Sequence, residues 1–186
     1  RAGEVGVEPE LKTTALYKHI RDEASSRALP GPVRHHLPVP LTPFVGRETE
    51  LAQIRDLLQD PACRLLTLVG PGGIGKSRLA LEAARLEVDR FPHGVYLVSL
   101  APLDVVEAVV PAVVAAMDLT LRSGDSTEHQ LLAHLRRRKL LLILDNLEHL
   151  VDAVGWVTGI LRIAPDVKVL ATSRVKLNGK GEHVLP

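Results

Sequence analysis

The chain alternates between short apolar runs and longer segments with helical periodicity. The apolar runs lie at residues 64–69, 94–100, 139–145 and 167–172, and aliphatic side chains dominate each of them. Each run has the length of a β-strand. Strands that are apolar along their whole length, and not only at alternate positions, are typical of a parallel sheet buried on both faces.

The intervening segments place apolar residues three or four positions apart, as on one face of a helix. Pro61 ends the first predicted helix, and Pro111 predicts that the third begins or kinks near it. The predicted helices cover residues 48–59, 75–90, 104–117, 126–137 and 149–163. Strands and helices therefore alternate, and the predicted fold class is α/β, a parallel sheet with helices on both faces.

The N-terminal part of the chain lacks this alternation. Apolar residues within residues 10–28 follow helical spacing, but one short amphipathic helix cannot bury its own stripe. Residues 29–43 contain five prolines, which favour a stiff, extended connector. We therefore expect a helical arm at residues 1–28, a linker at residues 29–43 and an α/β domain at residues 44–186.

The segment Gly70 to Ser77 (GPGGIGKS) matches the phosphate-loop pattern G-x-x-x-x-G-K-[ST], between a predicted strand and a predicted helix. Its glycines allow backbone N–H groups to approach phosphate oxygens, and the helix that follows adds its positive end. Lys76 is expected to reach the β- and γ-phosphates, and Ser77 to ligate Mg²⁺. The predicted nucleotide-binding residues of this segment are Gly70, Pro71, Gly72, Gly73, Ile74, Gly75, Lys76, Ser77 and Arg78.

Asp145 ends the apolar run at residues 139–145. A carboxylate at the end of a strand beside the phosphate loop is where such a site needs its second magnesium contact, often through water. The predicted metal ligands are therefore Ser77 and Asp145. Capping of the following turn is the alternative role for Asp145.

The next residues bear on hydrolysis. Asn146 stands where vigorous ATPases of this broad class usually carry a glutamate that activates water, and an amide is a poor general base. Glu148 is either a substitute base or a first-turn residue favoured by the helix dipole. The sequence thus predicts nucleotide binding more firmly than rapid turnover.

Arg174 follows the run at residues 167–172 and is placed to contact a γ-phosphate from the next strand end. A solvent-exposed arginine after a strand is the alternative. The candidate catalytic residues are therefore Lys76, Asp145 and Arg174.

The amino-acid composition limits the classes of binding partner that we expect. The chain has 23 Lys and Arg against 22 Asp and Glu, a formal charge of +1, which gives no electrostatic case for nucleic acid or an acidic membrane. Its single cysteine excludes an intrachain disulfide framework, and no apolar run resembles a signal peptide or a membrane span. We expect a cytoplasmic protein with no membrane contact.

Four ordered segments together carry a family resemblance: PFVGRETEL, GPGGIGKSRLALEAA, LLLILDNLEHL and VKVLATSRVKL. They resemble the STAND class of signalling ATPases, in particular the NB-ARC-like module of bacterial transcriptional regulators of the AfsR/SARP-like and LuxR-related kinds. The resemblance covers about residues 38–186. Residues 6–24 resemble the last helix of a bacterial transcriptional activator domain.

The resemblance implies a P-loop NTPase sheet with strand order 2-3-4-1-5, whose fifth strand begins at residues 183–186. It implies that Val45, Gly46 and Arg47 lie near the adenine and ribose, which favours ATP and ADP over GTP. It also implies a nucleotide switch, closed with ADP and released by ATP for self-association or for action of an effector domain. DNA would be bound only by domains outside this chain, which we expect to be a fragment of a longer protein.

The leading hypothesis is therefore a regulatory ATP/ADP switch with magnesium and slow hydrolysis. A small-molecule kinase on the same core would need an arginine-rich lid, and none is evident in the sequence. A nucleotide-free scaffold for protein interaction is the third hypothesis, against which the intact Gly70 to Ser77 argues.

Overall fold

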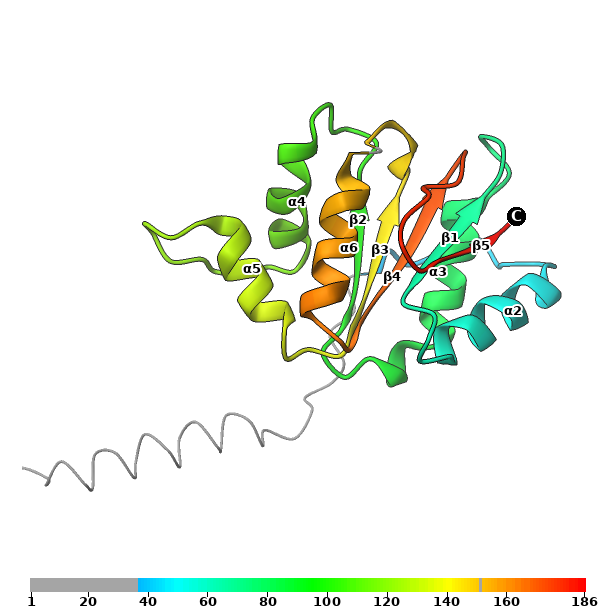
Figure 1. The fold of residues 1–186 in the computed structure, drawn as a ribbon. Coiled ribbons are helices and arrows are strands. Elements are labelled where there is room, and N and C mark those ends of the chain that lie inside the picture. The colour runs from blue at the N-terminus through cyan, green and yellow to red at the C-terminus, as the bar shows by residue number, and fades with distance from the viewer. Residues whose placement is uncertain (1–36, 151) are drawn as a thin grey trace, which may run out of the picture. The chain divides into compact units, whose positions relative to one another are not determined.

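Five parallel strands form the centre of the computed structural model, which describes residues 37–150 and 152–186. Neighbouring strands follow the order β2-β3-β4-β1-β5 (Figure 1), which confirms the predicted fold class and strand order. The predicted helix at residues 10–28 and residues 29–36 of the predicted linker lie outside the described residues. The strands are Leu65–Val69 (β1), Val95–Ser99 (β2), Leu140–Asp145 (β3), Val167–Ser173 (β4) and Glu182–Leu185 (β5).

Helices cover both faces of the sheet, as the apolar strands predict (Figure 1). One face packs against α4, α5 and α6, and the other against α2 and α3. The α-helices are Glu48–Gln59 (α2), Lys76–Leu86 (α3), Val109–Ala116 (α4), Thr127–Leu135 (α5) and Ala153–Ile163 (α6). Short 3-10 turns lie at Val88–Arg90 (η1), Val106–Ala108 (η2) and Leu147–His149 (η3).

Several α-helices are shorter than predicted because 3-10 turns occupy part of the predicted ranges. The segment at residues 104–117 begins with η2, and α4 starts only at Val109. Pro111 therefore falls in the first turn of α4, where its missing N–H has no helical partner to lose. Likewise η1 occupies the end of the range predicted for α3, and η3 precedes α6.

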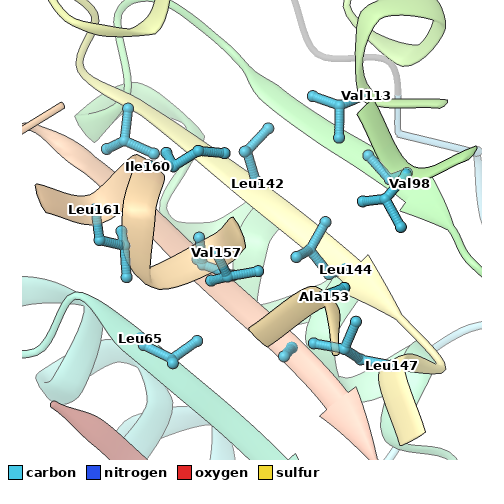
Figure 2. Close-up of a cluster of buried hydrophobic side chains, with 14 of the residues drawn as sticks. Leu65, Val98, Val113, Leu142, Leu144, Leu147, Ala153, Val157, Ile160 and Leu161 are labelled. Carbon is cyan, nitrogen blue, oxygen red and sulfur yellow. The ribbon is translucent and has the colours of Figure 1, made fainter. Parts of the chain in front are cut away.

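The strands supply alternate residues to the two faces. Leu142 and Leu144 of β3 pack with α4 and α6, whereas Leu141 and Ile143 pack in the cluster that contains α2 and α3. Figure 2 shows Leu142 and Leu144 beside side chains of α6, with Val113 of α4 nearby. Burial of both faces explains why β1, β2, β3 and β4 read as largely apolar runs.

The predicted linker also reaches this core. Leu37 is buried in the cluster with α2 and α3, although it lies before the predicted domain start at residue 44. The chain between Leu37 and α2 thus runs close to α3. Hydrogen bonds from Arg78 of α3 to Thr42 and Pro43, and from Arg47 to Ile74, hold this segment beside the phosphate loop.

Parallel register brings the carboxyl ends of the strands to one edge of the sheet. Val69 of β1 pairs with Ser173 of β4, and Ser99 of β2 pairs with Asp145 of β3. The N–H of Gly70 donates to the Ser173 carbonyl at 3.2 Å, so the phosphate loop leaves the sheet beside the end of β4. All candidate catalytic residues follow or end strands at this edge.

Substitution of Leu142 by alanine is expected to lower the free energy of unfolding by about 2–5 kcal/mol, because it opens a cavity in a fully buried site. Urea denaturation followed by circular dichroism measures the change. Leu41→Ala is the matched control, because the Leu41 side chain is fully exposed and should leave the unfolding curve unchanged. Equal losses in the two variants would contradict the assigned core.

Candidate nucleotide-binding site

The phosphate loop joins β1 to α3. Gly73 has φ 78° and Gly75 has φ 90°, in the left-handed region that glycine enters without strain. These two residues turn the chain sharply, and α3 then starts at Lys76. The sequence pattern thus forms a tight loop that ends directly on a helix N-terminus.

The N–H groups of this loop are available for an anion. Among the described residues, no backbone carbonyl accepts a normal hydrogen bond from the N–H groups of residues 72, 73 and 75–77. Unpaired N–H groups that lead into a helix N-terminus form a site for phosphate oxygens. The local structure therefore fits a nucleotide phosphate chain.

The Lys76 side chain folds back over this loop. Its Nζ donates to the carbonyl oxygens of Gly70 at 2.8 Å and Pro71 at 2.9 Å. An ammonium group has three donors, so one remains for a further acceptor. Lys76 therefore lies where a phosphate on the loop would meet its charge.

A cavity of about 360 Å³ opens beside the loop. Three cationic side chains contribute to its lining, together with one carboxylate and the hydroxyl of Ser77. Its lining residues are Gly72, Gly73, Gly75, Lys76, Ser77, Arg78, Asn146, Glu148 and Arg174. The excess of positive charge suits a polyanion such as a nucleotide triphosphate.

Asp145 does not line this cavity, although the next residue, Asn146, does. Asp145 is held by a residue that the sequence analysis did not assign. The Thr172 hydroxyl donates to Asp145 Oδ1 at 2.6 Å and accepts from the Asn146 N–H at 2.9 Å. Thr172 is fully buried. In the sequence, Thr172 is marked only by being a polar residue near the end of an apolar strand. The ends of the parallel strands lie together at this edge of the sheet.

Asn146 adopts a left-handed conformation, with φ 65° and ψ 56°. Asparagine tolerates this region better than most residues that carry a Cβ atom. The backbone turn thus gives a structural reason for an asparagine at the position where fast ATPases of this broad class carry a water-activating glutamate. Its side chain lines the cavity.

Arg174 pairs with Glu148 at the edge of the cavity. Arg174 Nε lies 3.0 Å from Glu148 Oε1, and the two side chains are 67% and 18% exposed. The guanidinium also lies against the loop, since a Cβ atom added to Gly72 would come within 3.5 Å of it. The structure therefore brings Arg174 to the phosphate loop, as its sequence position suggests, together with Glu148.

A second cavity of about 170 Å³ adjoins the first and shares Gly75 and Arg78 with it. Phe44, Val45, Arg47 and Ile74 complete its lining. Val45 and Arg47, predicted to lie near the base and ribose, are therefore beside the loop. Gly46 lies between them with φ 78° and does not line this cavity.

Two arginines fasten this segment to the loop and to α3. Arg47 donates to the Ile74 carbonyl at 2.7 Å. Arg78 donates to the carbonyl oxygens of Thr42 at 2.8 Å and Pro43 at 2.6 Å, and its guanidinium lies 5.8 Å from the centre of the Phe44 ring. Phe44, Val45 and Arg47 of this segment thus form one wall of the second cavity.

Burial shifts pKa values at the amino ends of strands. Burial raises the pKa of the Cys63 thiol and lowers the pKa of the Lys168 ammonium, and both residues lie at the amino ends of strands.

Within the described part of the chain, no cluster of three His, Cys, Asp or Glu residues forms a metal site. Over the same residues, no helix combines the length and apolar character needed to cross a membrane.

Thr172→Val is expected to lower the free energy of unfolding by about 1–3 kcal/mol, because the partly buried Asn146 N–H and Asp145 carboxylate lose a partner. Urea denaturation measures this loss. Thr158→Val is the matched control, since the Thr158 hydroxyl donates only to the Gly155 carbonyl of its own helix. A Thr172→Val loss no larger than the control's would contradict the bridging role.

Comparisons with known proteins place these features in context. Residues 43–157 match the AAA ATPase domain family. An uncharacterized protein of Mycobacterium tuberculosis is 36% identical over 151 residues, which cover 81% of this chain and 38% of that protein. A second protein of this species, provisionally named an HTH-type transcriptional regulator, is 38% identical over 120 residues, which cover 64% of this chain and 13% of that protein.

This chain therefore corresponds to less than half the length of either relative. Two solved structures share the fold at low identity. Cdc6p from Pyrobaculum aerophilum aligns with TM-score 0.58 and 16% identity, covering 83% of this chain and 48% of that one. A STAND protein with a tetratricopeptide repeat sensor from Pyrococcus horikoshii aligns with TM-score 0.52 and 20% identity, covering 83% of this chain and 25% of that one.

Proposed function

This chain belongs to the AAA ATPase domain family, and we propose that it is the ATP/ADP switch of a larger bacterial transcriptional regulator, with slow hydrolysis. The observation that carries this proposal is the phosphate loop with unpaired N–H groups beside a cation-rich cavity. That arrangement suits a nucleotide whose terminal phosphate is sensed by the protein.

The phosphates would lie along residues 72–77, with Lys76 exchanging a loop carbonyl for phosphate oxygens. Proteins of this family generally use nucleotide with Mg²⁺. Ser77 and Asp145 would hold the ion, and Mg²⁺ would neutralise phosphate charge. The Oδ1 atom of Asp145 is engaged by Thr172, which leaves Oδ2 for the ion or its water.

The nucleoside would occupy the second cavity. Val45 and Ile74 are exposed apolar side chains there, and the Phe44 ring lies beside the Arg78 guanidinium. An apolar wall next to the loop suits the face of a purine ring. Preference for adenine over guanine is part of the proposal and rests on the family resemblance of residues 45–47.

Arg174 would report the γ-phosphate. Its guanidinium already lies against Gly72, and only its Nε has a charged partner. Arginine has further N–H donors that can contact phosphate oxygens. ATP and ADP would therefore differ in whether Arg174 finds a ligand on the loop, which is the difference a switch must detect.

The regulatory part of the proposal draws on the relatives. One relative carries the provisional name of an HTH-type transcriptional regulator, and one structural neighbour is a STAND protein. We propose that DNA is bound by other domains, because this chain has a formal charge of only +1. The attribution to AfsR/SARP-like or LuxR-related regulators, and the division at residues 28 and 43, stay predictions.

Calorimetric titration of ATP, ADP and GTP, each with Mg²⁺, tests the proposal directly. The chain is expected to bind ATP and ADP in preference to GTP. Lys76→Ala is expected to weaken ATP binding at least about tenfold, because it removes the charged donor of the loop. Lys176→Ala, at an exposed position after β4, is the matched control.

Absence of nucleotide binding by the wild-type chain would favour the alternative hypothesis of a scaffold. Equal affinity of Lys76→Ala and wild type would refute the role given to Lys76.

Asp145→Asn is expected to weaken Mg²⁺-dependent ATP binding about 10- to 100-fold. The asparagine keeps an oxygen for the Thr172 hydroxyl and removes only the charge that Mg²⁺ needs. The measurement compares ATP affinity with Mg²⁺ and with EDTA. Asp118→Asn, at an exposed left-handed position, is the control, and undiminished Mg²⁺ dependence in Asp145→Asn would exclude Asp145 as a ligand.

A further inference from the structure

A separate cavity of about 470 Å³ opens at the amino edge of the sheet. It shares no lining residue with the two cavities beside the phosphate loop. We propose that this cavity binds a small organic anion, which carries a carboxylate or phosphate group on a compact apolar body. The inference goes beyond the proposed nucleotide switch and uses none of the residues of the nucleotide site.

The cavity lies where β1, β5 and α6 come together. Leu65 begins β1, Gly181 directly precedes β5, and Arg162 lies in the last turn of α6. Leu65 pairs with Glu182, the first residue of β5, in parallel register. The phosphate loop follows the other end of β1, so the two sites lie at opposite edges of the sheet (Figure 1).

Every charged side chain that lines this cavity is cationic. These side chains are Arg64, Arg162 and Lys180, and no Asp or Glu lines the cavity with them. Arg162 and Lys180 are exposed and stand where water solvates their charges. A concave site with three cations and no carboxylate favours an anionic ligand.

The backbone holds the Arg64 guanidinium in place. Its Nη2 donates to the carbonyl oxygens of Ala164 and Val167, between the end of α6 and the start of β4. These bonds also offset the negative end of α6, which would otherwise repel an anion. Among the described residues, Nη1 has no hydrogen-bond partner, and its two N–H donors are therefore the ones that a ligand would use.

Arg64 also lacks a paired negative charge. No carboxylate of a described residue forms an ion pair with it. Burial lowers the pKa of the Arg64 guanidinium, and the more distant charge of Asp166 acts in the opposite direction to a smaller extent. A bound anion would supply the counter-charge that the protein leaves out.

Glycines on α6 leave room for the apolar body of a ligand. Gly155 and Gly159 both line the cavity, and beyond its own turn of helix a Cβ atom added to either would meet nothing within 4 Å. Leu65 and Leu161 add apolar surface, and Figure 2 shows these two side chains on the α6 side of the sheet. The volume lies in the range of small-molecule sites.

The test titrates three probes with the same naphthalene body into the full chain by ligand-detected NMR at constant ionic strength. The probes are naphthoate, naphthyl phosphate and the neutral naphthamide. Both anions are expected to bind with Kd of about 1 mM, and the amide at least about fivefold more weakly. Naphthyl phosphate is titrated into Lys76→Ala, so that the phosphate loop does not contribute. The tighter of the two anions identifies the head group of the ligand.

The double variant Arg162→Ala/Lys180→Ala is expected to weaken both anions at least about fivefold. Arg137→Ala/Lys176→Ala is the matched control, because it removes the same charge from exposed positions that do not line the cavity. Its affinities should stay within about twofold of the wild type. These exposed positions keep the test independent of Arg64, whose substitution would also remove the backbone bonds of its Nη2.

Gly159→Leu tests the place without changing any charge. The leucine is expected to fill the cavity and to abolish binding of both anions, while the thermal unfolding temperature holds or rises because leucine favours helix more than glycine does. Ala133→Leu, at an exposed position of α5, is the matched control and should bind as the wild type does.

Binding of the anions that both Arg162→Ala/Lys180→Ala and Gly159→Leu reduce would support the inference. Anions that bind no more tightly than naphthamide would overturn it. So would naphthoate binding that Lys76→Ala abolishes and Arg162→Ala/Lys180→Ala leaves intact, because the probe would then lie on the phosphate loop. Each of these results leaves the nucleotide titrations unaffected, so failure of this inference and failure of the proposed function are distinguishable.

Discussion

Parallel pairing of the strands is the constraint on which the site depends. Helices cover both faces of the sheet, so the middle of each central strand is occupied by buried apolar side chains and offers no place for a charged site. Polar residues are instead collected where the strands end, and parallel register puts all those ends at one edge. Gly70, Asp145 and Arg174 are far apart in sequence and lie at the same edge of the sheet for this reason.

The groups at this edge are already engaged with one another. Lys76 donates to two carbonyls of its own loop, Asp145 accepts from Thr172, and Arg174 pairs with Glu148. A nucleotide would therefore exchange existing contacts and would not meet free charges. Exchange lowers the net gain from each contact, but it lets the site distinguish ligands by which partner each one displaces.

Local patterns predicted much of this structure. The phosphate loop and the apolar strands are contiguous in sequence, and their glycine spacing and composition were sufficient to identify them. The strand order came from the family resemblance. The Thr172–Asp145 and Glu148–Arg174 contacts join residues 26 or 27 positions apart on different elements, so no sequence periodicity reports them. Helix ends were mispredicted where 3-10 turns replace α-helix, because both turn types share similar apolar spacing.

The left-handed turn at Asn146 bears on how this fold could evolve. A glutamate there would have to adopt a backbone conformation that its Cβ atom disfavours, and that conformation aims the Asn146 N–H at Thr172. The backbone conformation at residue 146 therefore disfavours a glutamate at the position where fast ATPases most often carry their general base. Faster hydrolysis through a glutamate at this position would therefore require a change in the backbone turn before the change in side chain, so the slow hydrolysis that we propose would be preserved by the turn.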